Sequence, residues 1–405
     1  MNDFSLPDSI YPIDGVEIGV AKAHVRYPNR DDLTVFKFAD TASTALVSTQ
    51  NAFCAAPVII AKEHITQACP KFLLINTGNA NAGTGQDGIT KATNTCQALS
   101  KLGECTPQEI LPFSTGVIGE SLPDERIINA LPDALANLSP NNWEQASYAI
   151  MTTDTRPKVA SRQITIDDTT YHITGISKGA GMIRPNMATM LGFVATDAHI
   201  TPKLLQRMLA CLTEQSFNRI SIDGDTSTND CCTLTATAKA LHAPLIDDES
   251  HPHYQALFDA LADVFIDLAT KIVKDGEGAT KFITITVTGG QTSDDCTKVA
   301  YAVAHSPLVK TAFFASDPNW GRIVASIGNA GVKIDPSQVN IHLDDVMICQ
   351  AGGLNPAYTE EQGQAVMSRP QITITIDLGQ GNATDTVYTC DLSYDYVKIN
   401  ADYRS

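Results

Sequence analysis

The chain has 405 residues, of which 43% are hydrophobic and 18% are charged, and its formal net charge at pH 7 is −17. This length allows a large core, formed either by two domains or by one large sandwich. Because 28 Lys and Arg stand against 45 Asp and Glu, no basic face for nucleic acid is expected, and the acidic balance favours solubility.

The N-terminal segment MNDFSLPDSIYPIDG has neither a basic region nor an apolar run, and no apolar run in the chain approaches the length needed to cross a bilayer. The ten cysteines include no Cys-x-x-Cys pair, and the nine histidines include no His-Glu-x-x-His. We therefore expect reduced thiols and no zinc site. These features predict a cytoplasmic protein with no metal, no other cofactor and no membrane partner.

The first part of the chain alternates short apolar runs with polar turns, which predicts strands. The expected strands cover residues 16–20, 33–38, 55–60 and 71–75. The last of them leads directly into NTGNANAGTG, residues 76–85, and so dense a set of small polar residues predicts a loop. Such a loop either binds a ligand or simply turns the chain. A helix is expected over residues 88–102 from its helical apolar spacing.

A second apolar run followed by small polar residues is ILPFSTGVIG, residues 110–119. A strand followed by hydroxyl residues and a glycine suits a turn whose amide nitrogens point outward, which is one way to build an oxyanion hole. An ordinary strand end is the alternative. Beyond it, the pattern predicts a helix over residues 125–138 with a kink at Pro132, a cluster of hydroxyl residues at 151–158, and two strands. These two strands are expected at residues 159–166 and 171–176.

Near the middle of the chain lies the segment SKGAGMIRPNMATML, residues 177–191. If the bond between Ala188 and Thr189 is cut, Thr189 carries both a nucleophilic hydroxyl and a base, its own α-amine, with a reference pKa of about 7.7 to 8.0. Gly179, Gly181 and Pro185 would allow a tight and specific loop. The alternatives are a glycine-rich turn before a buried strand, or a phosphate loop, which the order Lys-Gly-x-Gly disfavours.

The second half of the chain contains two further polar loops between regular elements. SIDGDTSTND, residues 221–230, fails as a calcium loop because Thr228 and Leu234 stand where glycine and glutamate are required. KDGEGATKF, residues 274–282, holds Glu277 between two glycines, where a carboxylate is either aimed into a cleft or simply solvated. The expected strands are residues 191–196, 282–287, 371–378 and 386–392, and the expected helices are residues 200–215, 254–273 and 298–314.

Taken together, these segments resemble the ornithine acetyltransferase (glutamate N-acetyltransferase) family. The run KGAGMIRPNMATML matches the family's processing site without a gap, and NTGNANA, STGV, DGDTSTND, DGEGATK and DPNWGR occur in the family's order. The resemblance implies an α+β fold, a layered sandwich of β-sheets covered by helices, of the self-processing, N-terminal-nucleophile-like type of DmpA and ornithine acetyltransferase. It also implies an α chain of residues 1–188, a β chain of residues 189–405, and a heterotetramer of two α and two β chains.

The resemblance further implies a role for particular residues. Cleavage falls between Ala188 and Thr189, Thr189 is the nucleophile, and Thr115 with Gly116 forms the oxyanion hole. The implied substrate-binding residues are Thr155, Lys178, Thr189, Glu277, Asn400 and Ser405.

The implied reaction moves the acetyl group of N2-acetylornithine to glutamate in arginine biosynthesis through an acetyl-threonine, and some members of the family also use acetyl-CoA. Two alternatives remain open from the residues. An N-terminal-threonine amidase or aminopeptidase would resolve the acyl-enzyme with water. An unprocessed amino-acid-binding protein would keep a single chain.

Overall fold

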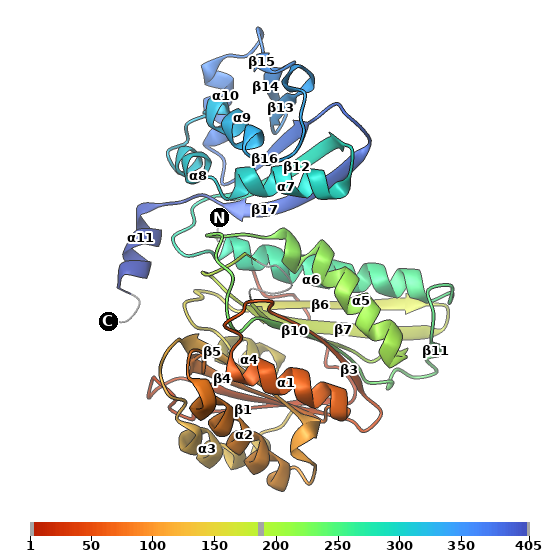
Figure 1. Ribbon diagram of the computed structural model, residues 1–405. Helices are drawn as coiled ribbons and strands as arrows, with labels where there is room; N and C mark the ends of the chain where they lie inside the picture. The colour runs from red at the N-terminus through yellow and green to blue at the C-terminus, as the bar shows by residue number, and fades with distance from the viewer. Residues whose placement is uncertain (1–3, 185–189, 403–405) are drawn as a thin grey trace. The chain divides into compact units, whose positions relative to one another are not determined.

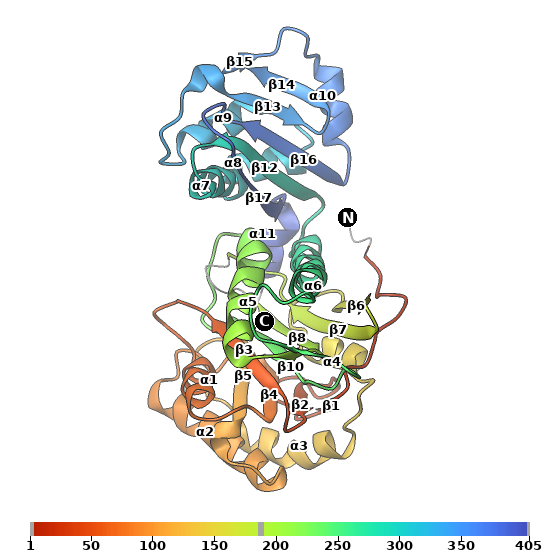
Figure 2. The same cartoon turned by 90° about the vertical axis from the view of Figure 1, so that its right-hand side faces the viewer.

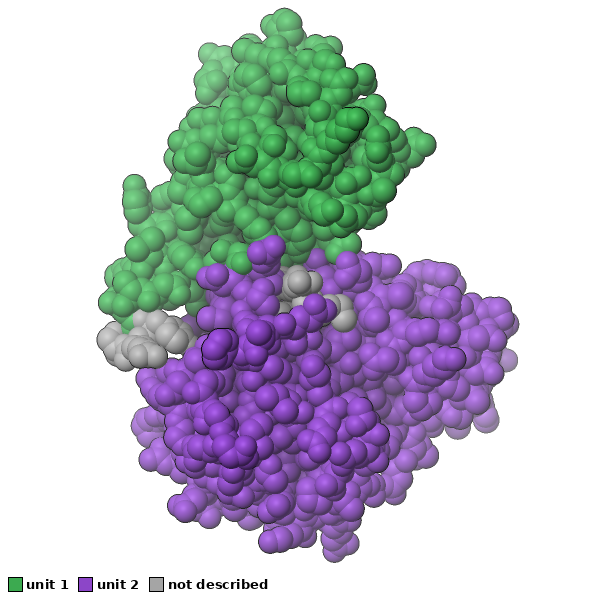
Figure 3. Space-filling view, in the orientation of Figure 1, with its two compact units in different colours: residues 1–3, 219–224, 273–405 green, residues 4–218, 225–272 purple. Residues whose placement is uncertain are grey.

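The structure is a computed structural model that describes residues 4–184 and 190–402, and the chain divides into two compact units. Within the described residues, the larger unit contains residues 4–218 and 225–272, and the smaller unit contains residues 219–224 and 273–402. Figure 3 colours the two units separately. No helix among these described residues is both long enough and apolar enough to span a membrane.

The larger unit contains two sheets that face each other, with strand orders β1-β2-β4-β5 and β3-β10-β8-β7-β6 (Figures 1 and 2). The first sheet consists of β1 (Val16–Ala21), β2 (Leu33–Phe38), β4 (Phe72–Asn79) and β5 (Ile110–Val117). The second consists of β3 (Ser43–Ser48), β10 (Cys231–Ala236), β8 (Leu191–Thr196), β7 (Thr169–Lys178) and β6 (Lys158–Ile166). A short parallel pair is formed by β9 (His199–Ile200) and β11 (Leu245–Ile246).

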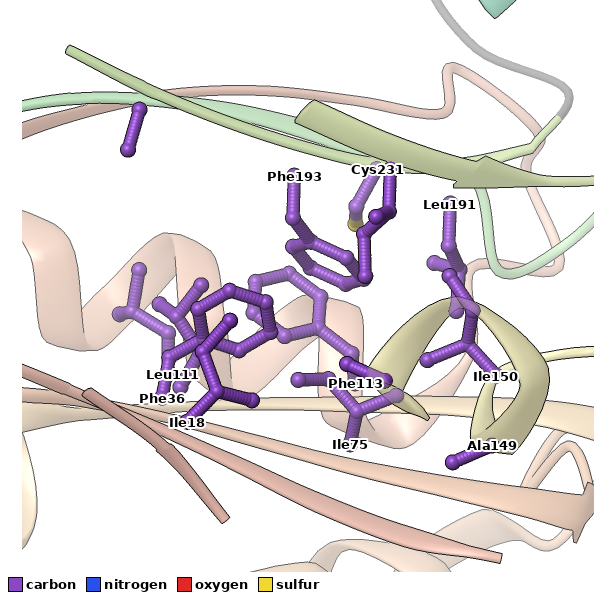
Figure 4. Packing of buried hydrophobic residues seen from close by; sticks show 14 of the residues in the cluster. Ile18, Phe36, Ile75, Leu111, Phe113, Ala149, Ile150, Leu191, Phe193 and Cys231 are labelled. Atoms are coloured by element: carbon purple, nitrogen blue, oxygen red, sulfur yellow. The ribbon is translucent and has the colours of Figure 1, made fainter. Parts of the chain in front are cut away.

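An aromatic core fills the space between these two sheets (Figure 4). Phe193 of β8 lies 5.2 Å from Phe113 of β5 and 5.7 Å from Phe36 of β2, measured between ring centroids. The Phe36 ring in turn meets Trp143 edge-on at 5.6 Å. Such pairs contribute about 0.5–1.5 kcal/mol each beyond the burial of their area. The packing therefore fixes one sheet against the other.

Helices cover the outer faces of both sheets, so the layered α+β sandwich expected from the sequence is confirmed (Figures 1 and 2). The helices of the larger unit are α1 (Ala56–Gln67), α2 (Gly85–Leu102), α3 (Asp124–Ala136), α4 (Trp143–Ala149), α5 (Pro202–Gln215) and α6 (Tyr254–Lys274), the last of which ends in the smaller unit. Helices α2 and α3 pack outside the first sheet, where Leu99 and Leu131 meet Leu33 and Val35. Short 3₁₀ turns are η1 (Pro107–Glu109), η2 (Phe217–Arg219) and η3 (Pro336–Gln338).

The strand predicted over residues 55–60 is wrong, because these residues begin helix α1. Pro57 lies in the first turn of this helix, where a missing N–H costs nothing and the fixed φ angle suits the helix. The apolar run is buried on one side of the helix, and Ile59 on the other side is 45% exposed. A short apolar run of this kind does not distinguish a strand from a helix.

The smaller unit is one six-stranded sheet of order β15-β14-β13-β16-β12-β17 with helices packed against one face. Its strands are β12 (Phe282–Gly290), β13 (Asn340–Leu343), β14 (Val346–Gln350), β15 (Gly353–Leu354), β16 (Gln371–Asp377) and β17 (Ala383–Cys390). Its helices are α7 (Ser293–Ala304), α8 (Pro307–Phe314), α9 (Trp320–Gly328), α10 (Glu360–Met367) and α11 (Tyr394–Ala401). The single helix predicted over residues 298–314 is wrong, because Ser306 caps a new helix that begins at Pro307.

The second sheet of the larger unit combines strands from both sides of the segment that contains the predicted cleavage site. Strands β3, β6 and β7 precede this segment, whereas β8 and β10 follow it. Strand β8 lies between β7, with which it pairs antiparallel, and β10, with which it pairs parallel. The predicted boundary between residues 188 and 189 therefore falls within one structural unit, between two hydrogen-bonded neighbouring strands.

Candidate active site

The two polar motifs of the first half lie side by side at one edge of the first sheet. Strands β4 and β5 are parallel, and their register pairs Thr77 with Thr115 and Gly78 with Gly116. Because the carboxyl ends of parallel strands meet at the same edge, the segments that follow both strands converge there. Strand β4 continues through Asn79, so the first four residues of the predicted loop are strand and only the rest is loop.

Side chains from three segments hold the backbone at this edge. The Ser114 hydroxyl donates to the side-chain Oδ1 atom of Asn76 at 2.6 Å, and the side-chain amide of Asn76 donates to the main-chain carbonyl of Asn79 at 2.9 Å. The buried Asn229 amide donates to the carbonyls of Ala80 and Ser114 at 2.5 and 2.9 Å. These asparagines satisfy buried main-chain groups, which is a positioning role. The sequence analysis gave no role to Asn229.

Gly116 occupies a place that only glycine fits. Its φ angle is +136°, and a Cβ atom there would lie 2.3 Å from the carbonyl carbon of Gly78 and 2.5 Å from the nitrogen of Asn79. The absence of a side chain lets the ends of β4 and β5 approach each other closely. The neighbouring Thr115 side chain is buried, and the residue is only 8% exposed.

Strand β7 of the second sheet carries Lys178 to the same place. The Lys178 ammonium donates to the Thr115 hydroxyl oxygen at 3.1 Å, so the ends of one strand from each sheet meet here. Because the ammonium occupies a lone pair of this hydroxyl, the Thr115 hydrogen is directed elsewhere and remains a donor for another acceptor. The structure thus brings together two of the predicted site residues as a charged donor and a polarised hydroxyl.

The chain on both sides of the predicted cleavage site is fixed. On the N-terminal side of the predicted cleavage site, Ile183 pairs with Thr226, and the Thr226 hydroxyl donates to the Arg184 carbonyl at 3.1 Å. On the C-terminal side of the predicted cleavage site, the Met190 carbonyl accepts from the Cys231 amide at 2.9 Å. Strands β7 and β8 are antiparallel neighbours, with Lys178 opposite Leu191.

The predicted cleavage residues Ala188 and Thr189 lie outside the described residues, as does Ser405.

A buried carboxylate follows helix α4 and contacts the start of this connection. Asp154 and Lys158 have fully buried side chains with a separation of 2.6 Å between Oδ1 and Nζ. Asp154 also accepts from the Gly179 amide at 2.6 Å and from the Thr152 amide at 3.0 Å. The predicted substrate-binding residue Thr155 is the exposed neighbour of Asp154. The sequence analysis named Thr155 from this hydroxyl cluster and gave no role to Asp154.

The pKa of the Asp154 carboxyl lies well below its usual value. Burial alone raises this pKa, but the positive charges of Lys158 and Lys178, together with hydrogen bonds from Lys158 and the Thr152 amide, more than offset that effect. The carboxylate therefore stays ionised at neutral pH.

The predicted residues of the second half lie in the smaller unit, where two of them contact each other. The Asn400 amide of α11 donates to the Glu277 carboxylate at 2.8 Å, and Glu277 is 9% exposed. Glu277 lies between α6 and β12, as the sequence predicts. The next residue, Gly278, has a φ angle of +67°, and a Cβ there would lie 2.5 Å from the Tyr396 nitrogen. Helix α11 thus packs directly against the turn that carries Glu277.

Within residues 4–184 and 190–402, no group of three or more His, Cys, Asp or Glu side chains is arranged to hold a metal ion. In the rejected calcium loop, the Asp223 carboxylate accepts a hydrogen bond from the Tyr396 hydroxyl at 3.2 Å.

Comparisons with known proteins agree with one another. The model of the ArgJ family matches residues 17–405. A protein of Psychrobacter arcticus named arginine biosynthesis bifunctional protein ArgJ is 62% identical over 406 residues and covers 100% of both chains. A protein of the same name from Pseudomonas syringae pv. tomato is 53% identical over 398 residues and covers 98% of both. A crystallised arginine biosynthesis bifunctional protein ArgJ from Bacillus halodurans is 38% identical with a TM-score of 0.51, and the match covers 53% of this chain and 99% of that one.

Proposed function

The chain belongs to the ArgJ family and is an acetyltransferase of arginine biosynthesis, and we propose that Thr189 is the nucleophile of its acetyl transfer. The observation that carries this proposal is the contact between Lys178 and Thr115, which lies at the start of the loop that leads to Thr189. That contact supplies a polarised hydroxyl, which is the kind of donor that an oxyanion needs.

In the first half-reaction, the Thr189 hydroxyl attacks the acetyl carbonyl of N2-acetylornithine, and the α-amine of the same residue accepts the proton. Thr115 and the Gly116 amide donate to the oxyanion of the tetrahedral intermediate. The carbon–nitrogen bond then breaks, ornithine leaves with the proton, and an acetyl ester remains on Thr189. In the second half-reaction, the amine of glutamate attacks this ester, and N-acetylglutamate leaves as Thr189 regains its proton.

The nucleophile is created by self-cleavage in this proposal. The Thr189 hydroxyl attacks the carbonyl carbon of Ala188, the peptide becomes an ester, and water opens it into an α chain of residues 1–188 and a β chain of residues 189–405. The hydrogen bonds at Arg184 and Met190 support this step, since they hold the chain on both sides of the proposed cleavage site. The match to the crystallised Bacillus halodurans chain covers 99% of that chain but only 53% of this one. A relative that is processed into two chains of about half this length would give such a match.

Cleavage would not separate the two halves. Strand β8 of the second half pairs with β7 of the first half along six residues, and β10 of the second half pairs along its whole length with β3 of the first. Both pairs lie in the same sheet, whose inner face is buried in the aromatic core.

Substrate recognition is assigned to residues with complementary chemistry. An ammonium such as that of Lys178 suits a substrate carboxylate, and a carboxylate such as that of Glu277 suits a substrate amine. The proposed substrate-binding residues are Thr155, Lys178, Thr189, Glu277, Asn400 and Ser405. Because ornithine and glutamate share the same amino-acid head, one set of contacts serves both half-reactions, which favours ping-pong kinetics.

The proposal includes three further points. The name of the curated relatives, a bifunctional protein, supports a second reaction in which acetyl-CoA replaces acetylornithine as the donor. The processed chains form a heterotetramer of two α and two β chains. The enzyme acts in the cytoplasm, where arginine biosynthesis supplies its substrates.

The test uses purified protein, N2-acetylornithine, and assays with and without glutamate. Wild type should form N-acetylglutamate only when glutamate is present, and Thr189→Ala should remain a single inactive chain. Thr66→Ala is the matched control, because Thr66 is exposed on α1 and its hydroxyl donates only to Glu63 of the same helix. Cleavage or acetyl transfer that persists in Thr189→Ala would refute the proposal, and so would acetate release by wild type at the same rate without glutamate.

A further inference from the structure

Two fully buried side chains of opposite charge, Asp154 and Lys158, lie beside the candidate active site, and the mechanism above uses neither of them. Burying two charges is costly even when they pair, and such a pair is weak evidence for stability. The sequence places them four residues apart, but the segment is a loop between α4 and β6, so this is not a pair within a helix. The other contacts of Asp154 point to a role beyond stability.

Asp154 contacts the chain at the point where β7 ends. Its Oδ1 atom accepts from the Gly179 amide at 2.6 Å, and Gly179 directly follows Lys178. The carboxylate also attracts the charge of Lys178 itself. One carboxylate thus fixes the backbone directly after Lys178 and attracts the ammonium that reaches Thr115.

The contact between Lys178 and Thr115 affects the direction in which the Thr115 hydroxyl hydrogen points. The Lys178 ammonium donates into the Thr115 hydroxyl oxygen, which leaves the hydroxyl hydrogen to donate to a third atom. An ammonium that swung away would free the Thr115 hydrogen to turn toward any nearby acceptor. The orientation of the proposed oxyanion donor therefore depends on where Lys178 is held.

We propose that Asp154 is a positioning residue, which holds Lys178 and the turn at Gly179 so that the Thr115 hydroxyl points at the developing oxyanion. Lys158 offsets the charge of the buried carboxylate, since its ammonium donates to Asp154 and to the Arg156 carbonyl at 3.2 Å. This inference rests on the proposed function, because it assumes that Thr115 is the oxyanion donor.

The matched variants separate positioning from stability. Asp154→Asn alone leaves the Lys158 charge buried without its carboxylate, which is strongly destabilising. The double variant Asp154→Asn/Lys158→Met removes both charges and keeps the shape of the Asp154 side chain. Lys158→Met alone is the control, because Asp154 then keeps its two amide donors and the nearby Lys178.

The transfer rate of each variant is normalised to the fraction that forms acetyl-enzyme, which mass spectrometry measures. We expect the double variant to lose about 100-fold in kcat with KM changed by less than about threefold, since the contact acts on the transition state. Lys158→Met should keep kcat within about threefold of wild type. The positioning role is overturned if the double variant keeps its kcat, or if Lys158→Met loses as much as the double variant.

Combining the Asp154 and Lys178 variants in one protein measures whether the two residues act together, which a purely structural role of Asp154 would not produce. If Asp154 acts through Lys178, then adding Asp154→Asn/Lys158→Met to Lys178→Gln should lower kcat by less than about twofold further. Full additivity of the two effects would contradict the inference, and so would failure of every Asp154 variant to fold. Wild type that forms no acetyl-Thr189 would instead overturn the proposed function itself.

Discussion

Replacing Gly116 with alanine tests whether the close approach of β4 and β5 shapes the active site. The new Cβ would lie 2.3 Å from the Gly78 carbonyl carbon, whereas ordinary van der Waals contact begins near 3.4 Å. The two strand ends would have to separate by about 1 Å, and both obstructing atoms belong to the backbone, which cannot rotate away. A misplacement of about 1 Å in a catalytic group can cost about 100-fold in rate.

We therefore expect Gly116→Ala to lower kcat by about 100-fold, because the Thr115 hydroxyl and the Gly116 amide move away from the oxyanion. The control is Gly119→Ala, three residues along the same segment. Gly119 also has a positive φ angle, +84°, but a Cβ there would meet no atom within 4 Å. Both substitutions strain the backbone, because alanine rarely adopts a positive φ angle, and only Gly116→Ala adds a steric clash.

The assay is steady-state acetyl transfer, normalised to the folded fraction from thermal unfolding. Gly119→Ala should keep kcat within about threefold of wild type. If Gly116→Ala also kept its kcat, the strand ends would not define the oxyanion donors, and the reasoning would be refuted.

Three further results are expected. Lys178→Gln should lower kcat by about 100-fold, since it weakens the donor to Thr115, and steady-state kinetics that showed only a KM effect would contradict this. Glu277→Gln should raise KM for N2-acetylornithine by about 10-fold to 100-fold with little change in kcat, because a charged hydrogen bond to its free side-chain amine, worth about 1.5–3 kcal/mol, is lost while the amide oxygen still accepts from Asn400. Because the folded pKa of Asp154 is lowered, its contribution to stability is complete above the unfolded carboxyl pKa of about 3.9 and is lost as pH falls from there toward the folded value. Thermal unfolding between about pH 6 and pH 3 should therefore show a smaller loss of stability in Asp154→Asn/Lys158→Met than in wild type, and equal losses would count against the assignment.

Local pattern was sufficient for most strands and for the long amphipathic helices. Alternating burial in β12, where Ile283, Ile285 and Val287 are buried, matches its alternating sequence. Helix α5 buries Leu204, Leu205, Met208, Leu209 and Leu212, as the predicted spacing requires. These elements each present one apolar face, so the periodicity alone identifies them.

Pattern failed where the apolar run was short or where tertiary contacts decided the structure. Residues 55–60 carry β-branched residues typical of a strand, yet they form helix α1, which packs against β5 and α2. Residues 76–79 are polar and were predicted as loop, but they extend β4 because their side chains are satisfied by neighbouring backbone and hydroxyl groups.

The candidate site, like the fold, was predicted from local pattern only in part. The motif pattern correctly placed Glu277 at a helix-to-strand junction. The turn predicted at Thr115 and Gly116 is wrong, because strand β5 continues through both residues to Val117, which agrees with the alternative of an ordinary strand end. The contact between Thr115 and Lys178 joins strands of two different sheets, so no local spacing encodes it. The sequence analysis gave Asp154 no role, because local spacing reveals neither its burial nor its contact with the Gly179 amide, 25 residues away.

The most direct measurement is the intact mass of the purified protein after incubation with N2-acetylornithine in the absence of glutamate. Two chains, residues 1–188 and 189–405, should appear, with the second heavier by one acetyl group located on Thr189, and glutamate should remove that group. A single 405-residue polypeptide that transfers acetyl at the full rate would contradict an N-terminal threonine nucleophile.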